Sequence, residues 1–159
     1  MSSEGKLFIA CGEGQVDAVR LLLDNGAEVD RANKNGSTPL HSACFKGHVG
    51  AAWLLLDKDA EVDRASKNGE TPLWVACWEG HVDAARLLLD KGADVHKATN
   101  SNRTPLHAAS YDGHLDVVRL LLANGADADV KDKDGDTPVA DAKSKGHSSI
   151  VALLEEHRK

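Results

Sequence analysis

The chain has 159 residues, of which 42% are hydrophobic and only 4% aromatic, and its formal net charge at pH 7 is −6. This acidic balance, with basic residues scattered along the chain, lacks the electrostatic footprint of a nucleic-acid-binding protein. No apolar run approaches the roughly 20 residues that span a membrane, and the first residues do not resemble a secretory signal. We therefore expect a soluble, cytoplasmic protein that has neither a nucleic-acid partner nor a membrane anchor.

Three markers recur along the chain with a period of 33 residues. They are a Thr-Pro pair, a Gly-His pair and a Leu-Leu-Leu run. Their copies begin at Thr38, Thr71, Thr104 and Thr137, at Gly47, Gly80, Gly113 and Gly146, and at Leu21, Leu54, Leu87 and Leu120. Self-similarity at a fixed period of this size is the signature of a repeat array. Each unit of such an array buries its apolar face on its neighbours rather than in one central core.

The markers divide the chain into five units of a single domain, residues 1–159. The first unit lacks the Thr-Pro pair, and the last unit carries polar residues on its helices. Because a solenoid has to close its two ends against water, we interpret both as capping repeats and expect them to be more polar. The units cover residues 1–32 (first cap), 33–65, 66–98 and 99–131 (full repeats) and 132–159 (last cap).

Each full unit predicts two helices. The threonine of the Thr-Pro pair can cap a short first helix, with proline at the first helical position, where its missing N–H costs nothing. That helix stops at the glycine of the Gly-His pair, which can adopt left-handed geometry. A second helix then covers residues 49–57, 82–90 or 115–123. Polar stretches between the units, such as Asn33-Lys34-Asn35-Gly36, predict hairpin fingers.

One unit reads Thr-Pro-Leu-His-Ala-Ala over residues 104–109, then Gly113-His114, a Leu-rich segment and Gly125-Ala126-Asp127. This pattern resembles the ankyrin repeat, and the resemblance extends over residues 4 to 157. It implies an all-α solenoid, an ankyrin repeat array of helix-turn-helix units joined by β-hairpin fingers. In that family the fingers and the first helices line a concave face that binds other proteins. The resemblance also implies a non-catalytic chain whose partner is another protein.

The cysteines and histidines follow the same period. Cys11, Cys44 and Cys77 share one position of three successive units, so about 8–10 Å separates them when helices stack, which is too far for a disulfide. The resemblance gives the repeated histidines structural hydrogen bonds around the finger and the helix start. A metal site needs several ligands within one small sphere, whereas equivalent histidines of neighbouring units lie about 10 Å apart. Motifs for phosphate binding, nucleophilic catalysis or zinc hydrolysis do not occur, so we expect no cofactor, no metal and no enzymatic activity.

The few aromatic residues are concentrated in the three full units. Phe45, Trp78 and Tyr111 share one position near the end of the first helix, where the terminal units carry Gly12 and Ser144. The resemblance places this position and the charged residue after it on the concave face. The predicted partner-binding residues are the aromatics Phe45, Trp74, Trp78 and Tyr111, the charged residues Lys46, Glu79 and Asp112, and a polar rim on the fingers made of Asn35, Ser37, Asn68, Glu70, Ser101 and Arg103.

Two interpretations of these aromatics are open. Trp, Tyr and Phe are the side chains that anchor protein interfaces, and Trp74 precedes Trp78 by four residues, which places both on one helix face. Alternatively, the rings thicken the core between helices. Trp74 stands where other units have His41 and His107, a position that is partly buried in this interpretation. The mixed charge of the rim argues against a strongly acidic or basic partner.

The sequence thus predicts a protein-binding module with an aromatic patch as its anchor. Asp59 stands where other units have glycine, and Trp53 stands where they have arginine. Such breaks of local rules fit an engineered or selected binder, which would have no native compartment. The alternatives are a natural intracellular ankyrin adaptor and a homodimer formed through the aromatic patch.

Overall fold

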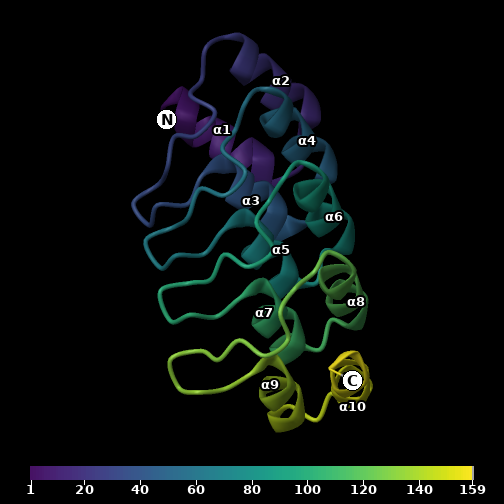
Figure 1. Cartoon of the computed structure of the whole chain (residues 1–159). Helices are drawn as coiled ribbons and strands as arrows, with labels where there is room; N and C mark the ends of the chain where they lie inside the picture. Colours follow the sequence, from purple (N-terminus) through teal and green to yellow (C-terminus); the bar gives the residue numbers. More distant parts are fainter. Residues whose placement is uncertain (159) are drawn as a thin grey trace.

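The structure is a computed structural model that describes residues 1–158 as a solenoid of ten α-helices without a β-strand. Each unit contributes one pair of helices, which are shown in Figure 1. The helices predicted at residues 49–57, 82–90 and 115–123 are confirmed at those bounds. The first helices are α1 (Ser3–Gly12), α3 (Pro39–Lys46), α5 (Pro72–Glu79), α7 (Pro105–Asp112) and α9 (Pro138–Ser144), and the second helices are α2 (Val16–Asp24), α4 (Val49–Asp57), α6 (Val82–Asp90), α8 (Leu115–Ala123) and α10 (Ser148–His157).

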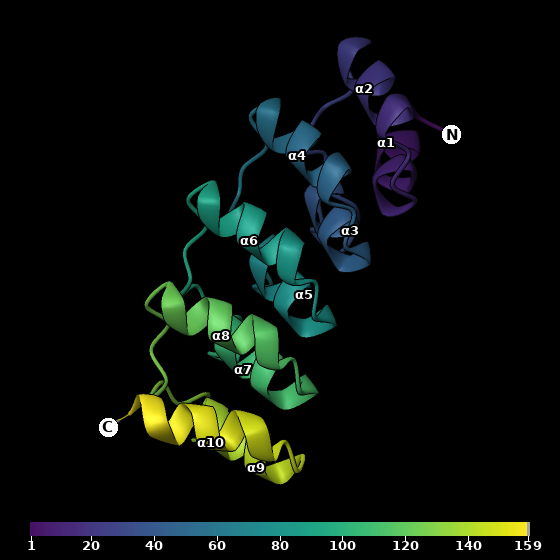
Figure 2. The same cartoon turned by 90° about the vertical axis from the view of Figure 1, so that its right-hand side faces the viewer.

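The helices form two rows. The first helix of each unit packs against the first helices of the neighbouring units and against its own second helix, while the second helices form the other row (Figure 2). The fingers project from the side of the first row (Figure 1). We call the surface formed by α1, α3, α5, α7, α9 and the fingers the inner face.

The core is a repeated layer of leucine, alanine and cysteine. Leu40 and Leu73, from two Thr-Pro-Leu motifs, have no exposed surface, and neither do the three cysteines, which are free. Burial raises the pKa of the Cys11 thiol to about 12 and also raises the pKa values of Cys44 and Cys77, because an apolar surrounding disfavours the thiolate. These cysteines therefore act as small apolar residues, as the sequence predicted.

Helix starts and ends use the residues that the sequence indicates. The Thr71 side chain accepts a hydrogen bond from the Trp74 N–H at 3.1 Å, and a proline follows each such threonine. The first helix of this unit ends at Glu79 and is capped by Gly80, whose φ is +80°. Asp59 is also left-handed, with φ of +63°, so it bears the strain that glycine avoids at equivalent positions.

The fingers are turns that are linked to one another. The Asn33 N–H donates to the Ser37 carbonyl at 2.9 Å and closes the first finger. Neighbouring fingers are joined by single backbone hydrogen bonds of 2.9–3.0 Å, which fix their spacing along the inner face. These bonds run from the N–H groups of Lys67, Asn100 and Lys133 to the carbonyls of Asn35, Asn68 and Ser101, respectively.

The two ends of the solenoid differ in polarity. Leu21 is 62% exposed in the first unit, whereas its equivalent Leu54 is 3% exposed because α4 packs against α2. Ile9 is also exposed, so the outer surface of this unit is apolar and differs from the polar cap expected from the sequence. The other end is polar: Ser148 replaces the valine of position 16, whose methyl group approaches Gly50 of the next unit.

Candidate functional site

Three aromatic rings form a stack across the inner face. The Trp74 and Trp78 ring centroids lie 5.3 Å apart with planes within 13° of parallel, and those of Trp78 and Tyr111 lie 5.8 Å apart within 16°. We call Trp74, Trp78 and Tyr111 the aromatic row. The four-residue spacing brings the two tryptophans together on α5, and the 33-residue period brings Tyr111 alongside them from α7. Each ring is partly exposed, and both tryptophans also pack against the core.

Phe45 lies apart from the aromatic row. It is 45% exposed, and the Lys46 ammonium lies 5.4 Å from its ring centroid. It borders its own pocket of about 360 Å³, which is lined by Phe8, Asn33, Ser37, His41, Ser42, Phe45, Lys46, Glu70 and Val75. The four predicted aromatic anchors therefore divide into a stack of three and a separate ring.

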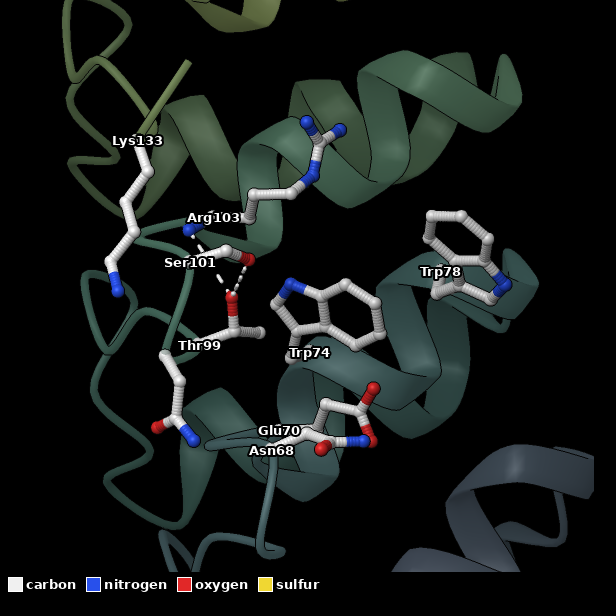
Figure 3. Close-up of a pocket in the computed structure, with 9 residues that line it drawn as sticks. Asn68, Glu70, Trp74, Trp78, Thr99, Ser101, Arg103 and Lys133 are labelled. Atoms are coloured by element: carbon white, nitrogen blue, oxygen red, sulfur yellow. Dashed lines mark hydrogen bonds between the residues drawn. The ribbon is translucent and has the colours of Figure 1, made fainter. Parts of the chain in front are cut away.

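A larger pocket of about 570 Å³ lies between the aromatic row and the fingers (Figure 3). Its lining residues are Asn68, Glu70, Trp74, Trp78, Thr99, Asn100, Ser101, Arg103 and Lys133. Six of these were predicted from the sequence. Thr99, Asn100 and Lys133 were missed, although Lys133 repeats Lys34 and Lys67 of earlier fingers and could have been found by that period.

The remaining predicted residues lie around these two pockets. Asn35 and Ser37 line a polar hollow between the first two fingers, together with Asn68 and Glu70. Glu70 borders all three hollows and so lies at the centre of the predicted site. Glu79 and Asp112 line none of the three.

Arg103 connects two units by ion pairs and is not a free side chain of the polar rim. Its guanidinium donates to Asp132 at 2.8 Å and to Asp141 at 2.7 Å, and the two carboxylates are 3% and 6% exposed. Burial by itself raises the pKa of Asp132, but the N–H groups of Asp136 and Asp134, together with Arg103, hold that pKa below its ordinary value. Burial raises the pKa of Asp141 in spite of Arg103. The arginine therefore fixes the third finger to the last unit.

Histidines hold the backbone of the aromatic positions. The Nε2–H groups of His81, His114 and His147 donate, at 2.9–3.0 Å, to the carbonyls of residues 45, 78 and 111 in the preceding unit. Because a carbonyl only accepts, Nε2 carries the proton in each ring. The sequence predicted a structural role for these histidines, and the structure shows that they position the backbone that carries the aromatic side chains.

His41 and His107 link the helix start to the next finger. In His41, Nδ1 accepts from the Thr38 N–H at 3.0 Å, and Nε2 donates to the Glu70 carbonyl at 2.9 Å. Trp74 occupies the same position in the middle unit, and its buried Nε1–H has no hydrogen-bond partner in residues 1–158. The tryptophan thus gives up a structural hydrogen bond while it adds a ring to the inner face.

The two buried histidines predict a loss of stability in acid. Burial lowers the pKa of both His41 and His107, so below about pH 6.5 the unfolded chain binds protons that the folded chain does not. The free energy of unfolding should therefore fall as pH drops from 7 toward 5. We expect His107→Gln to reduce the slope by up to about 1.4 kcal/mol per pH unit. Urea unfolding at several pH values measures this, and equal slopes for parent and variant would contradict it.

Comparison with protein families agrees with this architecture. A family model described as ankyrin repeats (3 copies) matches residues 7–99, and one described as ankyrin repeats (many copies) matches residues 90–140. A comparison with curated proteins found no significant match. Within residues 1–158, no helix has the length and apolar character to cross a membrane, and no group of three His, Cys, Asp or Glu side chains is arranged to hold a metal ion. From the matched repeats and the helix pairs, we conclude that the chain belongs to the ankyrin repeat family.

Proposed function

We propose that the chain is a non-catalytic module that binds a protein partner through its inner face, with the aromatic row as anchor. Ankyrin repeats are generally protein-protein interaction modules and are typically non-catalytic. The observation that carries the proposal is the partly exposed stack of Trp74, Trp78 and Tyr111 beside a pocket of about 570 Å³. Trp and Tyr in well-packed surface pockets are typical hot spots of protein interfaces.

The repeat itself does not require aromatic side chains at these positions. The terminal units carry Gly12 and Ser144 where the full units carry Phe45, Trp78 and Tyr111, and all five units fold into the same helix pair. We infer that selection for binding, natural or engineered, placed the rings there. Trp53 is 46% exposed on α4, and nothing in the structure explains it.

Trp78→Ala and Tyr111→Ala test the anchor. Each should weaken partner binding by about 30-fold or more, because truncation of a hot spot costs at least about 2 kcal/mol. A partner is first identified as a protein that the parent chain captures from a lysate and a Trp74/Trp78/Tyr111 triple-Ala variant does not. Binding of that partner is then measured by titration with the parent and with each single variant. Trp53→Arg is the control and should bind like the parent. It lies on α4, in the row of second helices, and it restores the arginine of the other units.

Circular dichroism and thermal unfolding of each variant separate loss of the site from loss of the fold. If both single variants bind as tightly as the parent, the aromatic row is not the anchor. The second candidate function is a homodimer formed through the same rings. Light scattering over a concentration series decides this, because a dimer loses mass in the triple-Ala variant and a monomeric module does not.

A further inference from the structure

The aromatic rings of the inner face differ in whether the chain supplies them with a cation. The Lys46 ammonium lies 5.4 Å from the Phe45 ring centroid. At the end of the aromatic row, Tyr111 has the Lys145 ammonium at 4.4 Å and the Arg103 guanidinium at 5.4 Å. Within residues 1–158, Trp74 and Trp78 have no such contact, although tryptophan binds a cation more strongly than tyrosine or phenylalanine.

A carboxylate lies beside the two tryptophans. Glu70 lines the pocket below Trp74 (Figure 3), and its carboxylate accepts a hydrogen bond from the Ser66 hydroxyl at 3.3 Å. It forms no ion pair with any other residue in the described part of the chain. The pocket thus combines two rings that lack a cation with one carboxylate that lacks a counter-charge.

The other charges of the pocket do not already satisfy Glu70. Arg103 faces two buried carboxylates, Asp132 and Asp141, so this group as a whole is negative rather than positive. Lys133 is exposed on the fourth finger and forms no ion pair within residues 1–158. With Glu70 counted, the pocket and its supporting carboxylates carry one more negative than positive charge, and the chain as a whole carries −6.

The shape of the pocket selects among cations. The two indole rings are stacked with planes within 13° of each other and centroids 5.3 Å apart, so they present parallel flat faces rather than a cage of rings around a point. A rounded ammonium group matches a flat ring face less well than a planar group does. A guanidinium is planar, stacks on aromatic faces and presents a fork of N–H donors that matches a carboxylate.

We propose that this pocket binds an arginine side chain of the protein partner, with the guanidinium stacked on the Trp74 indole beside Trp78 and hydrogen-bonded to Glu70. The proposal rests on the proposed function of the inner face and names the chemistry that one part of that face recognises. An aromatic or acidic residue of a partner in the same pocket would leave Glu70 without a counter-charge.

Three short peptides test the charge and the shape separately. They are acetyl-Gly-Gly-Xaa-Gly-Gly-amides in which Xaa is arginine, lysine or citrulline, the last being a neutral side chain of nearly the same shape as arginine. Titration of the ¹⁵N-labelled chain, followed by the indole N–H signals of Trp74 and Trp78, measures binding. We expect the arginine peptide to bind at least fivefold more tightly than either of the others.

Two variants test whether the peptide binds in this pocket. Glu70→Gln should remove the preference for arginine over citrulline, while Glu61→Gln, an exposed acid away from the pocket, should leave it unchanged. Trp74→His restores the residue of the neighbouring units and keeps the fold, and it should reduce arginine binding at least fivefold. Equal binding of arginine and citrulline peptides, or an unchanged preference in Glu70→Gln, would overturn the proposal.

The same variants distinguish failure of the arginine site from failure of the proposed function. A partner protein lost by Trp78→Ala but bound fully by both Glu70→Gln and Trp74→His would overturn the arginine site and leave protein binding intact. A chain that prefers the arginine peptide, but whose binding of proteins is unchanged in the triple-Ala variant, would support the pocket chemistry and contradict the proposed function.

Discussion

Replacement of Arg103 by methionine should lower the free energy of unfolding by about 3–5 kcal/mol, because it leaves two buried carboxylates without their counter-charge. Asp132 and Asp141 are almost fully buried, and Arg103 is their shared partner at 2.8 and 2.7 Å. Methionine keeps most of the side-chain volume, so the effect reports on charge rather than on a cavity. Urea unfolding followed by circular dichroism measures the change.

The loss should be confined at first to the last unit. In a repeat array each unit is stabilised mainly by its neighbours, and Arg103 connects the third finger to α9. We therefore expect hydrogen exchange to accelerate in α9 and α10 before it does in α3 and α5. Arg64→Met is the matched control: its contact with Glu61 is 3.9 Å long and exposed, and such surface pairs contribute below about 1 kcal/mol. Equal destabilisation by the two changes would show that the Arg103 cluster is unimportant.

Gly80→Ala should destabilise the chain by about 3 kcal/mol, from three sources. A left-handed alanine costs about 1–2 kcal/mol. A β-carbon at residue 80 would also clash with Nδ1 of His114, so the imidazole has to move. Its hydrogen bond to the Trp78 carbonyl, 2.9 Å in the parent, would then be lost at a cost of about 1 kcal/mol.

Gly92→Ala separates these contributions. Gly92 has φ of +89°, close to the +80° of Gly80, but a β-carbon there would meet nothing within 4 Å. This variant should bear only the backbone strain, about 1–2 kcal/mol. The difference between the two midpoints of urea unfolding measures the displacement of His114. A partner titration should in addition show weaker binding for Gly80→Ala, since His114 holds the backbone of Trp78. If the two variants are equally stable, His114 does not support this part of the inner face.

The periodic features of the fold and of the site could be predicted from the sequence. The Thr-Pro pairs and the glycines set the helix bounds, because each acts on the backbone within one turn. The stack of Trp74 on Trp78 follows from their four-residue spacing, and Tyr111 joins it because equivalent positions of adjacent units lie side by side. The carbonyl acceptors of the repeated histidines lie in the preceding unit, so local sequence did not identify them.

Features that occur in only one unit could not be predicted in the same way. The equivalents of Asp141 in earlier units include Val75 and Ala108, and those of Arg103 include Ser37 and Glu70. The Arg103 cluster therefore occurs only at the last interface, and comparison of equivalent positions hides it. Phe45 shares its sequence position with Trp78 and Tyr111 but stays outside their stack.

The two ends of the solenoid differ in whether they could pack against an additional repeat. The first unit presents Leu21 and Ile9 on a surface that an inner unit would cover with its neighbour. One more repeat fused ahead of α1 would bury this apolar surface, and the burial would stabilise the array. The opposite end presents Ser148 where inner units use valine or leucine, so it offers an added repeat less apolar surface to bury. We therefore expect a repeat added at the amino-terminal side to stabilise the array more than a repeat added at the carboxy-terminal side.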